Sequence, residues 1–188
     1  MKFTVSRNAL LNELNLVQGV IEKKSTIPIL ANILLEAADG RLEITATDLD
    51  VTIRCGCAVT VDAEGTTTIS ARRLFDIVRL LPDGADVGFS LLENDWVEVR
   101  CGKSHYKIVA LPRENFPSIP ESAPATAHIP SGVFRSMIQR TMFAITQEES
   151  RYSLNGALLA LFPSEIRMVA TDGHRLAVVS KIMQIPGM

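Results

Sequence analysis

An α+β fold built from a repeated unit, with helices packed on antiparallel sheets, is the architecture that this 188-residue sequence predicts. The first observation is an internal repeat, because the triplet Ala46-Thr47-Asp48 recurs 124 residues later (172 − 48) as Ala170-Thr171-Asp172. The same offset places Leu34 on Leu158 without a gap. The second observation is that segments of alternating apolar residues are interspersed with segments of helical spacing. The third is a composition typical of globular proteins, with 47% hydrophobic and 21% charged residues.

The first elements follow from this patterning. Residues 3–5 have the composition of a short strand, and Ser6 is a candidate N-cap for the helix that follows. That helix carries apolar residues on one face, namely Leu10, Leu14, Val17 and Ile21. Residues 41–48 alternate as a half-buried strand, and residues 51–61 keep period two long enough to predict one long strand.

A second helix is expected over residues 71–81, capped by Ser70 and ended by Pro82-Asp83-Gly84. Three further strands are expected over 87–91, 96–101 and 106–111. These elements predict a complete domain over residues 1–120, a linker over 121–130 and the first half of a second domain over 131–188. The second copy has only sixteen residues after Asp172 (188 − 172), so we expect the chain to stop inside it.

Composition excludes several classes of protein. The net charge of −2 excludes a uniformly basic nucleic-acid binder, although local basic patches remain open. No apolar run is long enough to span a membrane, and the N-terminus becomes polar too early for a secretory signal. Three cysteines are too few for a disulfide framework. A cytoplasmic protein is therefore the expectation.

Cys55-Gly56-Cys57 is the one segment that suggests a metal site. A zinc site needs about four ligands, usually in pairs separated by two to four residues, and no second pair lies nearby. Strand alternation places both thiols on the same buried face, so we favour a role in the core. No metal and no cofactor are expected.

Asp172-Gly173-His174-Arg175 allows two interpretations. A histidine close to an aspartate could act as a general base. However, Asp-Gly between two apolar strands is a strong hairpin signal, and no nucleophile or phosphate-binding loop accompanies it. We favour a turn that presents His174 and Arg175 as binding groups, and an enzyme that uses Asp172 and His174 remains the alternative.

Several motifs resemble one known family, the bacterial sliding clamp, which is the beta subunit of DNA polymerase III. They cover nearly the whole chain in order: Met1-Lys2-Phe3-Thr4-Val5, Ile27-Pro28-Ile29-Leu30, Ala71-Arg72-Arg73-Leu74-Phe75-Asp76, Arg151-Tyr152-Ser153-Leu154-Asn155-Gly156 and Val169-Ala170-Thr171-Asp172-Gly173-His174-Arg175-Leu176-Ala177.

The resemblance implies three repeated domains per subunit and a head-to-tail homodimer that forms a ring around duplex DNA. It implies a processivity factor without catalytic residues, which tethers the DNA polymerase III alpha subunit, the clamp loader and repair proteins through short linear motifs. Domain three would be absent from this chain, so we expect a fragment. A short clamp-like module that binds partners without closing a ring remains the alternative.

The same resemblance implies three groups of site residues. Sequence-independent DNA contacts would come from Lys24, Arg72 and Tyr152. The partner-peptide pocket would comprise Leu154, Thr171, Gly173, His174, Arg175 and Leu176. The dimer interface would comprise Arg73, Lys103, His105, Tyr106 and Ile108.

Overall fold

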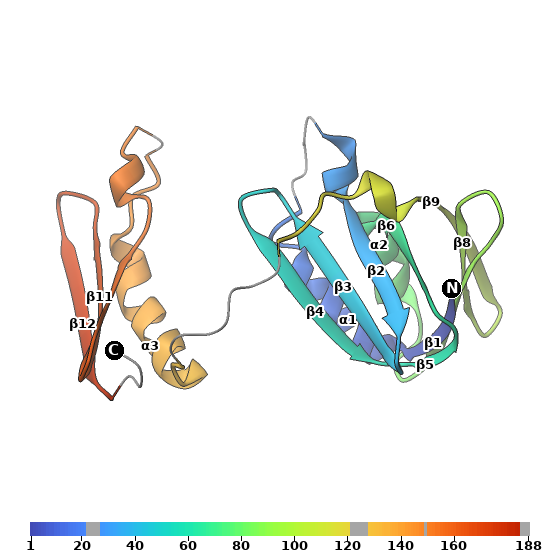
Figure 1. The fold of residues 1–188 in the computed structure, drawn as a ribbon, viewed down its shortest axis with the longest axis horizontal. Coiled ribbons are helices and arrows are strands. Elements are labelled where there is room, and N and C mark those ends of the chain that lie inside the picture. The colour runs from blue at the N-terminus through green and yellow to red at the C-terminus, as the bar shows by residue number, and fades with distance from the viewer. Residues whose placement is uncertain (22–26, 121–127, 149, 185–188) are drawn as a thin grey trace. The chain divides into compact units, whose positions relative to one another are not determined.

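The computed structural model describes the chain except for residues 22–26, 121–127, 149 and 185–188. It divides into two compact units, Met1–Pro120 and Glu121–Met188, and each is described here by itself (Figure 1). Both consist of helices packed on antiparallel sheet, so the predicted α+β class is confirmed. In the described part of the chain, no helix is long and apolar enough to cross a membrane.

In its described residues, the first unit contains nine strands, two α-helices and two short 3-10 helices. In chain order they are β1 (Lys2–Ser6), α1 (Arg7–Val17), η1 (Pro28–Ala31), β2 (Asn32–Ala38), β3 (Arg41–Thr47), β4 (Thr52–Ala58), β5 (Thr60–Ala63), β6 (Gly65–Ser70), α2 (Ala71–Leu80), β7 (Asp86–Leu91), β8 (Trp96–Cys101), β9 (Ser104–Leu111) and η2 (Arg113–Asn115).

These elements form two similar halves that exchange their first strands. The halves are β1-α1-β2-β3-β4 and β6-α2-β7-β8-β9. β1 pairs with β7 of the second half, and β6 pairs with β2 of the first, so the sheet order is β4-β3-β2-β6-β9-β8-β7-β1-β5.

The prediction of one long strand over residues 51–61 is wrong. The segment divides into β4 and β5, which are separated only by Val59. β4 lies at one end of the sheet order and β5 at the other. The sheet must therefore curl, because the two strands at its opposite ends are joined through a single residue.

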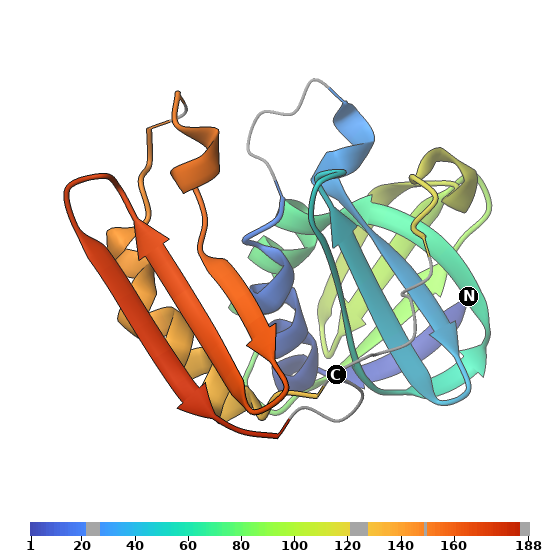
Figure 2. The same ribbon diagram turned by 60° about the vertical axis from the view of Figure 1, so that its left-hand side comes forward.

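The two helices bury the apolar face that their spacing predicts. Leu10, Leu14 and Val17 of α1 and Leu74 and Val78 of α2 are fully buried in one cluster. α1 contacts α2 and also β3 and β4, an arrangement that can be followed in Figure 2.

The helix boundaries differ from the prediction in two respects. α1 ends at Val17, so Ile21 lies beyond the helix. Ser6 and Ser70 occupy the N-cap positions, but neither side chain makes a capping hydrogen bond.

The second unit contains one α-helix and a three-stranded antiparallel sheet in the described residues. Its elements are α3 (Ser131–Thr141), η3 (Met142–Ala144), η4 (Tyr152–Leu154), β10 (Leu158–Phe162), β11 (Glu165–Thr171) and β12 (Leu176–Ile182). α3 packs on β11 and β12, with Met137, Ile166 and Met168 between them.

The predicted repeat is confirmed by the element bounds. Adding 124 to the bounds of α1, β3 and β4 gives the bounds of α3, β11 and β12. Residues 124 apart in these three pairs of elements therefore occupy the same position of the same element.

Candidate functional site

The hairpin between β11 and β12 is the best-defined polar structure of the second unit. The Asp172 carboxylate accepts hydrogen bonds from the backbone amides of His174 and Arg175, at 2.9 and 3.0 Å. Its second oxygen accepts the Arg175 Nε–H at 2.9 Å. The Thr171 hydroxyl accepts the Gly173 amide and donates to the Arg175 carbonyl. Backbone donation, first from His174, lowers the pKa of Asp172, so the carboxylate stays ionised and locks the turn.

The first unit contains the same turn. Asp48 accepts the amides of Asp50 and Val51, and the Thr47 hydroxyl bonds the Leu49 amide and the Val51 carbonyl. The repeated Ala-Thr-Asp triplet is therefore a turn-forming motif, and in the first unit it forms its turn without a histidine. The same role accounts for Asp172, whose contacts with His174 are to the backbone. The geometry thus favours the hairpin interpretation over an acid/base pair.

Arg151, which lies outside the hairpin, contacts the turn at residues 171–175. Arg151 donates from Nη1 to the Asp172 carbonyl at 2.9 Å, and its Nε pairs with Glu148 at 3.0 Å. Gly173 has a positive φ of 88°, and a Cβ there would lie 3.1 Å from Arg151 Nη1. Glycine at this position permits both the turn and the close approach of Arg151.

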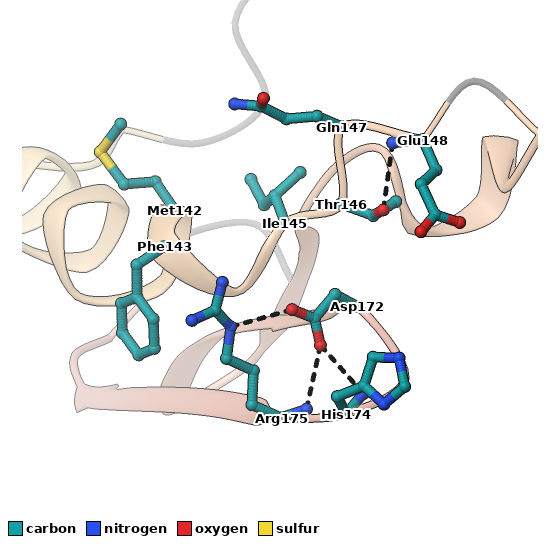
Figure 3. Close-up of a pocket in the computed structure, with 9 residues that line it drawn as sticks. All are labelled: Met142, Phe143, Ile145, Thr146, Gln147, Glu148, Asp172, His174 and Arg175. Carbon is teal, nitrogen blue, oxygen red and sulfur yellow. Dashed lines mark hydrogen bonds and ion pairs between the residues drawn. The ribbon is translucent and has the colours of Figure 1, made fainter.

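A surface cavity of about 760 Å³ opens beside the hairpin (Figure 3). One wall is apolar, and the Arg175 guanidinium lies over the Phe143 ring at 5.7 Å. The lining residues are Met142, Phe143, Ile145, Thr146, Gln147, Glu148, Asp172, His174 and Arg175.

Two of the six predicted pocket residues line this cavity, and the other four lie in the turn or close to it. His174 and Arg175 line the cavity, whereas Thr171 and Gly173 shape the turn that carries them. Leu176 is exposed at the start of β12, and Leu154 is half-buried in η4. The apolar wall at Met142 and Phe143 was not predicted, and no sequence motif marks it.

The predicted DNA contacts lie in different parts of the chain. Arg72 is exposed on α2, and no ion pair or hydrogen bond engages its side chain within the described residues. It lines a cavity of about 370 Å³ together with Gln18, whose buried amide nitrogen lacks a partner in the same described part. Tyr152 of η4 is 86% exposed. Lys24 lies outside the described residues.

Four of the five predicted dimer-interface residues lie on β9 or directly before it, and Arg73 lies on α2. Strand β9 pairs with β8 along its length but with β6 only at Ala110 and Leu111, so the rest of its outer edge is open in the described structure. Arg73, Lys103 and His105 are exposed, and Tyr106 is half-buried.

Ile108 differs from the expectation, because its side chain is 4% exposed and belongs to the core. Strand alternation turns the Ile108 side chain inward and the His105 side chain outward.

The hairpin formed by β8 and β9 carries one cluster of polar side chains, Glu98, Arg100 and His105. Glu98 bonds Arg100 Nε at 2.7 Å and His105 Nε2 at 2.6 Å. The hydrogen bond from Arg100, more than that from His105, lowers the pKa of Glu98.

The predicted core role of the two β4 thiols is confirmed. Cys55 and Cys57 are half-buried against the core cluster, and the Cys55 thiol donates to the Glu13 carbonyl at 3.6 Å. Burial raises the pKa of Cys55 to about 12. No group of three or more acidic, histidine or cysteine side chains positioned to hold a metal ion occurs among the residues that the structure describes.

Comparison with known families gives two matches that together cover most of the chain. A model described as the N-terminal domain of the DNA polymerase III beta subunit matches residues 1–120. A model described as the central domain of that subunit matches residues 128–186.

Individual relatives belong to the same family. The beta sliding clamp of Escherichia coli K12 is 41% identical over 182 residues, which are 96% of this chain and 50% of the relative. A Caulobacter crescentus beta sliding clamp structure superposes with a TM-score of 0.91 at 40% identity, covering 98% of this chain and 50% of the other. A structure of the Pseudomonas aeruginosa sliding clamp bound to griselimycin superposes with a TM-score of 0.91 at 40% identity. The match covers 99% of this chain and 51% of the other. The chain spans about half the length of the relatives it matches.

Proposed function

The chain belongs to the DNA polymerase III beta subunit family, and on this premise we propose that it forms part of a ring that encircles duplex DNA and tethers a replicative polymerase. The observation that carries the proposal is the ordered match of both units to consecutive clamp domains at about 40% identity. The predicted division into residues 1–120, 121–130 and 131–188 is part of the proposal.

Such a function needs no bond-making step. A ring is held on DNA by topology, so its contacts with phosphates can be weak and independent of sequence. Tethering raises the effective concentration of the polymerase at the primer end, which makes synthesis processive. An acidic chain with isolated cations on its helices fits this role, because a uniformly basic surface would hold the DNA too tightly to slide.

In this proposal Arg72, Lys24 and Tyr152 contact DNA. Arg72 is supported by its exposed guanidinium, which makes no ion pair or hydrogen bond within the described residues and could therefore donate to a phosphate oxygen.

The second unit would bind short segments of partner proteins. The turn at residues 171–176 presents His174 and Arg175 beside the apolar wall of the cavity, and Leu176 is exposed next to them. An apolar surface edged by donors suits a peptide with apolar anchors. The polymerase alpha subunit, clamp loader and repair proteins are the proposed partners.

The first unit would contact a neighbouring subunit through the open edge of β9. An unpaired strand edge accepts another strand through backbone hydrogen bonds. Arg73, Lys103, His105, Tyr106 and Ile108 remain the residues proposed for that contact.

Substitution of Arg72 by alanine tests the DNA contact. Loss of one phosphate contact is expected to reduce the slope of log affinity against log salt by about 0.9 for a duplex of mixed sequence. Fluorescence anisotropy over a series of KCl concentrations measures this slope.

Arg54→Ala is the matched control, because Arg54 lies on β4 and is already paired with Glu43 at 3.1 Å. Equal slopes for Arg72→Ala and Arg54→Ala would remove Arg72 from the DNA contact.

A further inference from the structure

The turn at residues 171–175 accepts one hydrogen bond that the equivalent turn of the first unit cannot accept from the same position. Arg151 donates from Nη1 to the Asp172 carbonyl at 2.9 Å. The position 124 residues earlier (151 − 124) is occupied by Ile27, whose side chain has no donor. The two residues are also equivalent in the structure, because they occupy the N-cap positions of η4 and η1. The two copies of the repeat therefore differ in whether a side chain donates to the turn from this position.

A second difference between the copies lies at the tip of the turn. Gly173 has a φ of 88°, and Leu49, which is 124 residues earlier, has a φ of 82°. The backbone is left-handed in both turns, although glycine adopts this conformation without strain and leucine does not. A Cβ at residue 173 would lie 3.1 Å from Arg151 Nη1, closer than ordinary van der Waals contact. Arg151 and Gly173 are thus a matched pair, because the glycine leaves room for the guanidinium.

The turn itself forms without this pair. In the first unit the side chains of Thr47 and Asp48 make the hydrogen bonds that close the turn. Thr171 and Asp172 make the same set of bonds in the second unit. The bond from Arg151 is additional to that set and comes from outside the hairpin. It therefore determines where the turn lies and not whether the turn forms.

Arg151 is itself held by the segment in which it lies. Its Nε pairs with the Glu148 carboxylate at 3.0 Å. The Glu148 amide donates to the Thr146 hydroxyl at 3.1 Å, and the Thr146 amide donates to the Leu154 carbonyl at 3.2 Å. Thr146 is buried, so these bonds begin in the interior of the second unit. Arg151 therefore connects the turn to a segment that has a fixed position of its own.

Arg151 is not one of the residues that line the cavity in the described structure, whereas His174 and Arg175 are. We propose that Arg151 is a positioning residue, which holds His174 and Arg175 where they receive a partner protein. Gly173 makes room for it, and Glu148 orients it. This inference rests on the proposed role of the turn in binding partners. A site that is already held in its bound conformation binds more tightly, because fewer groups lose freedom on binding.

Replacing Arg151 by isoleucine, the residue at the equivalent position of the first unit, tests the proposal in the native protein that carries this chain. Hydrogen exchange of the His174 and Arg175 amides, followed by mass spectrometry, measures how often the turn opens and is expected to become about fivefold faster. Affinity for the DNA polymerase III alpha subunit, measured by surface plasmon resonance, is expected to fall about fivefold. The midpoint of thermal unfolding is expected to stay within about 2 °C of the wild type, because the turn forms without Arg151.

Arg167→Ile is the matched control. The Arg167 side chain is 44% exposed and that of Arg151 is 41% exposed, and each pairs with a glutamate. The hydrogen bonds of Arg167 go to Glu165 and Ser180, at the other end of the hairpin, so exchange and affinity like those of the wild type are expected. Arg151→Lys keeps a charged donor for the Asp172 carbonyl and is expected to bind the alpha subunit more tightly than Arg151→Ile.

Faster exchange and weaker binding in Arg151→Ile, neither of which occurs in Arg167→Ile, support the proposal. Unchanged exchange overturns it, because Arg151 then does not hold the turn. Faster exchange with the affinity of the wild type also overturns it, because the contact is then only structural. If the wild-type protein does not bind the alpha subunit, the proposed partner site fails together with any role of Arg151 in it. The exchange rates distinguish that outcome from loss of the contact alone.

Discussion

Replacing Gly56 by alanine is expected to lower the free energy of unfolding of the first unit by about 3 kcal/mol. A Cβ at this position would lie 2.3 Å from the Leu42 carbonyl oxygen and 3.2 Å from the Glu43 Cα. Both atoms belong to the backbone of β3, so a side-chain rotation cannot relieve the overlap. β4 would have to move away from β3. Urea unfolding followed by the fluorescence of Trp96, the only tryptophan and a residue of the first unit, measures the loss.

The same substitution has a second, local readout. Cys55 and Cys57 flank Gly56, and burial raises the pKa of Cys55 to about 12, so its thiol stays protonated and unreactive near pH 8. Displacement of β4 is expected to speed the reaction of these thiols with a disulfide reagent at least about tenfold. Gly19→Ala is the control, because no atom of a non-adjacent described residue lies within 4 Å of a Cβ built there. Unfolding of Gly56→Ala within about 0.5 kcal/mol of this control would contradict the steric argument.

Replacing Arg7 by methionine is expected to cost about 2 kcal/mol of unfolding free energy. The Arg7 side chain is only 12% exposed and joins the start of α1 to the end of α2. It donates to the Val78 and Arg79 carbonyls at 3.1 and 2.8 Å and pairs with Asp83 at 2.6 Å. A cation at a helix C-terminus also compensates the helix dipole. Methionine keeps the aliphatic stem and removes these donors.

Arg79→Met provides the comparison for Arg7→Met in the same denaturation experiment. Arg79 is exposed, and the one side-chain pair that it makes among the described residues is a surface contact with Asp76 at 3.4 Å, so its loss is expected to cost less than about 0.5 kcal/mol. Equal losses for the two variants would show that Arg7 contributes no more than an ordinary surface arginine.

Much of the fold could be predicted because the repeated residues make repeated interactions. The two Ala-Thr-Asp triplets form the same set of side-chain hydrogen bonds in both turns, which explains why the residues recur at a constant offset. The hairpin at Asp172-Gly173 was predictable for a local reason, since glycine accepts the positive φ that this turn requires.

Other features depend on contacts between distant segments. Alternation continues through Val59 and Val61, although the chain passes there from one end of the sheet to the other. A local pattern records which side chains face inward and not which strand lies alongside. The apolar wall at Met142 and Phe143 depends likewise on tertiary packing.

Retention on DNA of different topology tests the central proposal most directly. The native protein that carries this chain would be loaded onto a singly nicked circular plasmid, with its loading factor present, and separated by gel filtration in about 200 mM salt, where phosphate contacts alone are weak. A sliding clamp is expected to elute with the circular plasmid and to be lost when one cut linearises it. Equal retention before and after the cut, or none on either form, would contradict the proposal that the chain forms part of a closed ring.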